Sequence, residues 1–219
     1  MRIAIDGPAG AGKSTVAREV ARRLGYAYID TGAMYRAVAL AALQAGIPAG
    51  DTEALSDLAQ NLEISLGCGE DGSTRVYLNG RDVSREIRTP EVSRFVSRVA
   101  EVPGVRLYLT EKQRSLAASG RVVMEGRDIG TVVLPDADRK FYLTATVQER
   151  ARRRYAEAAG EGHNISLEEQ INDILSRDER DASRGVAPLL QAPDAVMIDT
   201  TGKSPVQVVE IILALVHGG

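Results

Sequence analysis

The stretch Arg2-Ile3-Ala4-Ile5-Asp6-Gly7-Pro8-Ala9-Gly10-Ala11-Gly12-Lys13-Ser14-Thr15 decides the fold class. A short apolar run comes first, a glycine-rich turn follows, and a helical pattern opens at Lys13. The turn satisfies G-x-x-x-x-G-K-[ST], in which glycines let backbone N–H groups point inward at a polyphosphate. The helix that follows directs its positive N-terminal end at the same anion. The stretch therefore predicts a strand, a phosphate-binding loop (P-loop) and a helix, in that order.

The loop at residues 7–15 predicts that a nucleoside triphosphate binds, with two side chains in defined roles. Lys13 can reach the β- and γ-phosphates, and the Ser14 hydroxyl can ligate Mg²⁺. The pattern alone does not say what the phosphate is used for.

Apolar runs and helical patterns alternate along most of the chain, which is typical of an α/β doubly wound fold with a parallel sheet. Helices are predicted over residues 13–24 and 34–44, and from Pro205 onward behind an N-cap at Ser204. Five runs have the length and composition of buried strands: residues 3–5, 26–29, 122–124, 141–143 and 196–198.

Two segments break this alternation. Within residues 61–89, the runs 62–66 and 75–79 alternate apolar and polar residues, which predicts a small antiparallel β insertion. Residues 150–164 begin with an arginine-rich helical run and end in a glycine-containing polar stretch. That helix would follow the fourth strand, and ligands bind beyond the carboxyl ends of such strands.

Composition narrows the function classes. Hydrophobic residues make up 44% of the 219 residues, enough for a sizeable α/β core, and the net charge of −3 disfavours general nucleic-acid binding. The single cysteine, Cys68, excludes an internal disulfide. The most apolar later run, residues 206–216, is too short to span a bilayer. We expect a soluble cytoplasmic protein that binds neither membrane nor nucleic acid, and a monomer.

Arginines in loops and after strands indicate a second anion. Arg36 and Arg127 each follow a predicted strand, whereas Arg177, Asp181 and Arg184 have the spacing of one helical face. An alcohol acceptor would profit from a positioned base, whereas a phosphate monoester is mostly ionised and needs cations that offset anion repulsion. Abundant arginine beside only two histidines favours a phosphorylated acceptor.

Four motifs in order along nearly the whole chain resemble the bacterial cytidylate kinase family. They are Ile5 to Thr15, Asp30-Thr31-Gly32-Ala33-Met34-Tyr35-Arg36, the run from Glu125-Gly126-Arg127-Asp128 to Val133, and the run from Arg177 to Leu189. The resemblance implies a P-loop three-layer fold and transfer of the γ-phosphate of ATP to CMP or dCMP, with Mg²⁺.

The resemblance also implies roles for individual residues. The residues matching positions that bind the CMP phosphate, base and ribose are Thr31, Arg36, Ser97, Arg106, Arg127, Asp128, Arg177, Asp181 and Arg184. Cytosine offers two acceptors and one donor, so Ser97 and Arg106 can donate while Asp128 accepts. The expected catalytic set is Lys13, Arg127, Arg153 and Arg184.

The implied organisation has three parts. Residues 1–60, 90–149 and 165–219 would form the P-loop core, residues 61–89 a CMP-binding β insertion, and residues 150–164 a lid that closes over the phosphates and excludes water. Two alternatives share the loop: an alcohol kinase of shikimate-kinase type, and a regulator that senses ATP without phosphoryl transfer. A GTPase is disfavoured, because no Asn-Lys-x-Asp sequence occurs.

Overall fold

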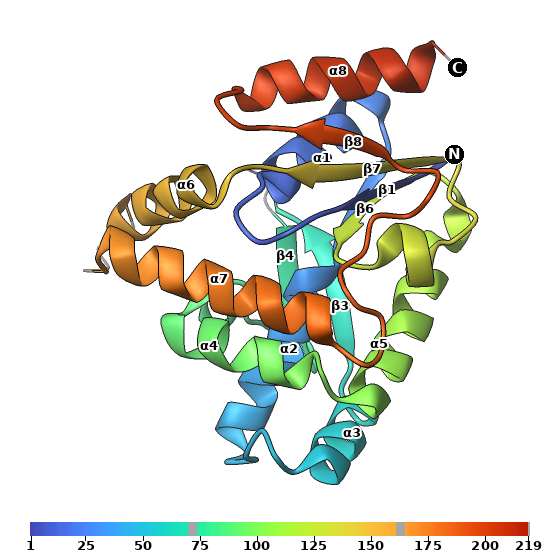
Figure 1. The fold of residues 1–219 in the computed structure, drawn as a ribbon. Coiled ribbons are helices and arrows are strands. Elements are labelled where there is room, and N and C mark those ends of the chain that lie inside the picture. Colours follow the sequence, from blue (N-terminus) through green and yellow to red (C-terminus); the bar gives the residue numbers. More distant parts are fainter. Residues whose placement is uncertain (70–73, 161–164, 219) are drawn as a thin grey trace. The chain divides into compact units, whose positions relative to one another are not determined.

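The computed structural model describes residues 1–69, 74–160 and 165–218, which are traced in colour in Figure 1. Contacts divide the chain into two compact units. One unit holds Met1–Tyr28 with Ser119–Gly219, and the other is Ile29–Ala118. Each has its own hydrophobic core.

A five-stranded parallel sheet carries the first unit, as predicted. Its order is β2-β6-β1-β7-β8, formed by β2 (Ala27–Asp30), β6 (Val122–Gly126), β1 (Arg2–Asp6), β7 (Arg139–Thr144) and β8 (Val196–Asp199). The boundary between the units falls within β2. Asp6, the last residue of β1, lies opposite Gly126 and Tyr142, so the carboxyl ends of three strands meet at one edge.

Helices α1 (Lys13–Leu24) and α8 (Pro205–His217) pack together over this sheet (Figure 1). Helix α1 has the predicted bounds and ends at Gly25, whose φ of 66° is left-handed backbone that glycine adopts without strain. Ser204 caps α8 as predicted, in a reciprocal capping box with Gln207.

Helices α6 (Val147–Gly160) and α7 (Leu167–Ser183) pack against each other in the same unit. Residues 150–160 of the predicted lid are helical, and residues 161–164 lie outside the described residues. The prediction that Arg184 shares a helical face with Arg177 and Asp181 is wrong in one respect, because α7 ends at Ser183 and Arg184 adopts extended backbone. A single π-turn, η3 (Ile129–Val133), follows β6.

The Ile29–Ala118 unit is built mainly of helices: α2 (Thr31–Gln44), α3 (Thr52–Gln60), α4 (Pro90–Val99) and α5 (Pro103–Leu116), with the short η1 (Glu86–Arg88). Helix α2 begins three residues before the predicted start, because the Asp30 carboxylate accepts from the Ala33 N–H and caps it. The short η2 (Ala117–Ser119) lies at the unit boundary.

The predicted antiparallel strands are present in this unit, shifted by one or two residues. Strands β3 (Ile64–Cys68), β4 (Thr74–Leu78) and β5 (Arg81–Asp82) form a three-stranded sheet in that order. The turn at residues 70–73 lies outside the described residues. Among the described residues, no helix is both long enough and apolar enough to cross a membrane.

Candidate functional site

The loop between β1 and α1 depends on glycines for its shape. Gly7 has a φ of 146°, and a Cβ on it would lie 2.0 Å from the Leu143 carbonyl oxygen. Gly10 has a φ of 77°, and a Cβ there would lie 3.0 Å from the Arg150 Cβ. Both glycines have a positive φ, which residues with a side chain rarely adopt, and both lie close to another segment of the chain. A side chain at either position would therefore distort the loop.

Lys13 is a buried lysine at the end of this loop. Its side chain is 6% exposed, and Nζ donates to the Pro8 carbonyl at 2.9 Å. Burial and then the charge of Arg127 together lower the pKa of Lys13 to about 7, against the opposing effect of Glu125 and Asp6. A phosphate group beside Nζ would favour the charged form of Lys13. We therefore expect Lys13 to be protonated when an anion is bound.

Ser14 and Glu125 bring two hard oxygen donors together where β6 ends. The Ser14 hydroxyl donates to Glu125 Oε1, and the Tyr28 hydroxyl donates to the same oxygen at 3.2 Å. A hydroxyl and a carboxylate suit Mg²⁺, which binds few protein ligands and takes the rest of its octahedron from water and phosphate. The described residues hold no cluster of three or more acidic, histidine or cysteine groups that would bind a metal without a nucleotide.

Asp6 fixes the turn that follows β6. Its two carboxylate oxygens accept from the N–H groups of Ile129 at 2.8 Å and Gly130 at 2.7 Å. Burial raises the pKa of Asp6 to about 6, although the two backbone hydrogen bonds favour its charged form. Asp6 thus links the phosphate loop to the segment that carries Arg127 and Asp128.

A cluster of arginines in the same unit surrounds one carboxylate. Arg127 Nε lies 2.9 Å from Asp181 Oδ2, and Arg184 binds the other oxygen. Burial, followed by the charges of Arg127 and Arg154, lowers the pKa of Arg177 to about 10. The buried Nε atoms of Arg154, Arg177 and Arg184 have no hydrogen-bond partner in the described part of the chain. Cations crowded in this way favour a bound anion.

The remaining predicted acceptor residues belong to the Ile29–Ala118 unit. Thr31 is buried at the start of α2, and Ser97 is buried on α4. Arg36 Nη1 donates to Ser93 Oγ at 2.8 Å, and Arg106 lies 5.4 Å from the centre of the Tyr35 ring. The predicted acceptor residues therefore form two groups, one in each unit. Helices carry the group in the Ile29–Ala118 unit, whereas the other group comes from the segment after β6 and from α7 with the residue that follows it.

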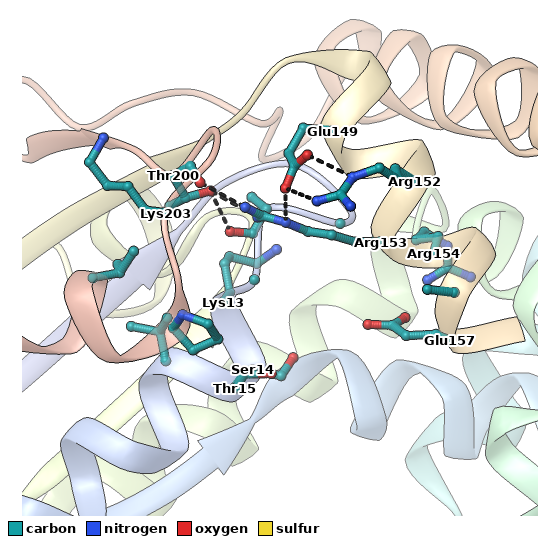
Figure 2. Close-up of a pocket in the computed structure, with 17 residues that line it drawn as sticks. Lys13, Ser14, Thr15, Glu149, Arg152, Arg153, Arg154, Glu157, Thr200 and Lys203 are labelled. Carbon is teal, nitrogen blue, oxygen red and sulfur yellow. Dashed lines mark hydrogen bonds and ion pairs between the residues drawn. The ribbon is translucent and has the colours of Figure 1, made fainter. Parts of the chain in front are cut away.

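A cavity of about 490 Å³ opens beside the phosphate loop (Figure 2). Its polar wall contains Lys13, Ser14, Glu149 and three consecutive arginines from α6, Arg152, Arg153 and Arg154. Val16, Pro205 and Val208 add apolar surface. The cavity can hold a nucleotide with its phosphates at the loop and an aromatic base against the apolar wall.

The four arginines of the run 150–154 differ in their surroundings. Arg150 is 4% exposed, forms a two-pronged ion pair with Asp178 at 3.0 and 2.7 Å, and donates to the Ala9 carbonyl. Arg152 is an exposed side chain paired with Glu149. Arg150 therefore ties α6 to the loop and to α7, whereas Arg153 and Arg154 face the cavity.

Sequence reasoning missed several residues that build this site. Asp6 and Glu125 lie within the quoted motifs, and their position at strand ends was the signal that could have marked them. Asp178 lies in the motif that begins at Arg177, and Thr200 lies in the loop that follows the last predicted strand, but their contacts join segments far apart in the chain and have no local signature.

Fold and site together define a P-loop nucleotide-binding protein of the α/β class. The sequence model described as cytidylate kinase matches residues 3–218. The chain is 59% identical to a cytidylate kinase of Symbiobacterium thermophilum, covering 96% of this chain and 93% of that one. It is 52% identical to a cytidylate kinase of Pelotomaculum thermopropionicum, covering 99% and 96%. The chain belongs to the cytidylate kinase family.

A solved structure shares the fold at low sequence identity. The chain aligns with an uncharacterized protein from Eubacterium ventriosum at a TM-score of 0.54 and 12% identity, covering 100% of this chain and 99% of that one.

Proposed function

We propose that the protein transfers the γ-phosphate of ATP to CMP or dCMP, giving ADP and CDP or dCDP. The observation that carries this conclusion is membership of the cytidylate kinase family over residues 3–218, at 59% identity to one relative. The loop geometry agrees, since a buried lysine and left-handed glycines are what a triphosphate requires.

On the donor side, residues 7–15 would surround the ATP phosphates with backbone N–H groups. Lys13 would become charged against the β- and γ-phosphates. Ser14, with Glu125 beside it, would hold Mg²⁺, which neutralises developing charge on the transferred group. The adenine would lie against Pro205 and Val208, which form the apolar wall of the cavity.

On the acceptor side, the CMP phosphate would be bound by Thr31, Arg36 and Arg127. Ser97, Arg106 and Asp128 would read the cytosine, and the group Arg177, Asp181 and Arg184 would bind ribose and phosphate. The acceptor is already ionised at neutral pH, so the chain needs no general base. Its arginines, with Arg153 from the donor side, would offset repulsion between the two anions and stabilise the transferring phosphoryl group.

Separate segments of the chain would have separate roles. Residues 61–89 would contribute to CMP binding, and residues 150–164 would close as a lid over a core formed by the remaining residues. The enzyme would act as a cytoplasmic monomer on small nucleotides, without membrane or nucleic acid.

A coupled assay of ADP release across a panel of acceptors tests the function. The panel contains CMP, dCMP, UMP and AMP, with shikimate and gluconate as alcohol acceptors. We expect CMP and dCMP to give the highest kcat/KM. Turnover of an alcohol with none of CMP, or binding of ATP without any transfer, would contradict the proposal.

A further inference from the structure

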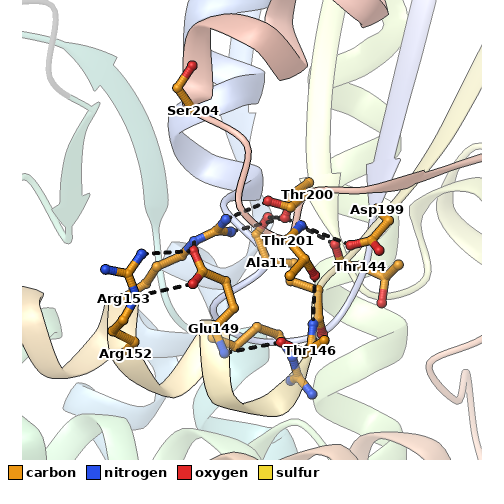
Figure 3. A network of polar contacts seen from close by, with 12 residues as sticks. Ala11, Thr144, Thr146, Glu149, Arg152, Arg153, Asp199, Thr200, Thr201 and Ser204 are labelled. Atoms are coloured by element: carbon orange, nitrogen blue, oxygen red, sulfur yellow. Dashed lines mark hydrogen bonds and ion pairs between the residues drawn. The ribbon is translucent and has the colours of Figure 1, made fainter.

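The Thr200 hydroxyl joins three segments that are distant in sequence (Figure 3). Thr200 follows β8 and is 2% exposed. Its Oγ1 lies 3.2 Å from the Ala11 carbonyl of the phosphate loop and 3.0 Å from the Thr144 carbonyl at the end of β7. Arg153 Nη1, from α6, donates to it at 3.0 Å. One buried side chain thus connects the loop, the sheet and the helix that carries the arginines.

Arg153 is held at all three of its guanidinium nitrogens. Nε donates to Glu149 Oε1 at 2.9 Å, Nη1 to Thr200 Oγ1, and Nη2 to the Thr200 carbonyl at 2.7 Å. The guanidinium lies against the phosphate loop, since a Cβ on Gly12 would be 3.6 Å from Nη1. Figure 2 shows it facing the same cavity as Lys13. These hydrogen bonds to Glu149 and Thr200 fix its orientation.

The Thr200 hydroxyl both accepts and donates a hydrogen bond. Oγ1 accepts from Arg153, so its single proton is available to the Ala11 or the Thr144 carbonyl. Valine has the shape of threonine but can do neither, whereas serine can do both. An arginine side chain that is already held in one orientation loses less conformational entropy when an anion binds, which is the advantage of preorganisation.

We propose that Thr200 is a positioning residue of the donor site, which holds Arg153 against the phosphate loop so that its guanidinium is preorganised for the donor nucleotide. This inference rests on the proposed function, because it takes the nucleotide at the loop to be the phosphate donor. Thr200 acts through Arg153, and the effect is on the donor rather than on the acceptor.

Calorimetric titration with ADP tests the proposal without requiring phosphoryl transfer. Thr200→Val should weaken ADP binding about tenfold, the equivalent of one hydrogen bond to a charged group. Thr200→Ser should bind ADP within about threefold of wild type. Thr144→Val is the matched control, because Thr144 takes part through its backbone carbonyl, and it should bind like wild type. In the coupled assay, the KM for ATP should rise in Thr200→Val while the KM for CMP stays unchanged.

A double-mutant cycle with Arg153→Met separates positioning from simple stabilisation. If Thr200 acts through Arg153, Thr200→Val should cost nothing further once Arg153→Met is present. Additive losses, equal losses in the valine and serine variants, or wild-type ADP binding in Thr200→Val would each overturn the inference. A wild-type protein that binds ADP without phosphorylating CMP would instead overturn the proposed function. The double-mutant cycle would still test the role of Thr200, because it measures ADP binding alone.

Discussion

The phosphate loop and the Ile29–Ala118 unit are built differently for the ligands that we propose for them. The loop relies on backbone: positive φ at Gly7 and Gly10 and a lysine placed at the start of a helix. The second unit would rely on side chains from separate helices, with Ser97 on α4 and Arg106 on α5. Backbone recognition suits a phosphate, which every nucleotide carries, whereas side-chain recognition suits a base, which distinguishes one nucleotide from another.

The largest effect should come from removing the charge at the loop. Lys13→Met should lower kcat by about a thousandfold, because the transition state gains charge where Lys13 would contact the β- and γ-phosphates. Steady-state rates with saturating CMP and ATP measure this, and circular dichroism checks that the fold survives. A kcat within tenfold of wild type would remove Lys13 from the catalytic set.

Arg127→Ala and Arg184→Ala should each lower kcat with CMP by about a hundredfold, because each removes a cation from the crowded set around Asp181. Loss of either partner also leaves Asp181 less well paired, so melting temperatures must be measured alongside the rates. Wild-type activity in both variants would refute their assignment to the acceptor phosphate.

Arg150 and Arg152 lie on one helix but should contribute differently to the free energy of unfolding. Arg150→Ala should destabilise the fold by about 3 kcal/mol, because it leaves Asp178 partly buried without its partner. Arg152→Ala should change the free energy of unfolding little, since exposed ion pairs contribute weakly. Urea denaturation of both variants gives the comparison, and equal values would contradict the structural role of Arg150.

The protein should take up a proton when it binds ADP at mildly alkaline pH. In the free protein the pKa of Lys13 is about 7, lowered by burial, so Lys13 is mostly neutral near pH 8.5. Phosphates beside Nζ favour the charged form, so the proton is taken up on binding, and the uptake should fade below pH 7, where Lys13 is already charged. Calorimetry in buffers of different ionisation enthalpy measures the uptake, and Lys13→Met should abolish it. Uptake that persists in this variant would point to another group.

The contrast between the two regions also explains what could be predicted from sequence. The loop, α1 and the five strands were predictable because their signals are local: a glycine pattern, apolar runs and helix caps. The start of α2 was missed because the Asp30 cap precedes the apolar pattern. Arg184 was placed on a helix because spacing alone does not mark where α7 ends.

The rest of the site depends on contacts between distant segments. The run 150–154 reads as one basic cluster, yet Arg150 is buried against Asp178 while Arg153 is held by Glu149 and Thr200. No local pattern distinguishes these arginines. The base-reading roles that we propose for Ser97 and Arg106 rest on family resemblance, because two buried polar residues on separate helices carry no sequence signature of their own.

The kinetics of Arg106→Met test most directly whether side chains of the Ile29–Ala118 unit recognise the acceptor base while the phosphate loop serves the donor. This change removes a proposed base contact and leaves the phosphate loop untouched. We expect the KM for CMP to rise about tenfold or more, the equivalent of one hydrogen bond to a charged group, while the KM for ATP stays within about twofold of wild type. An unchanged KM for CMP, or a rise in the KM for ATP of similar size, would contradict it.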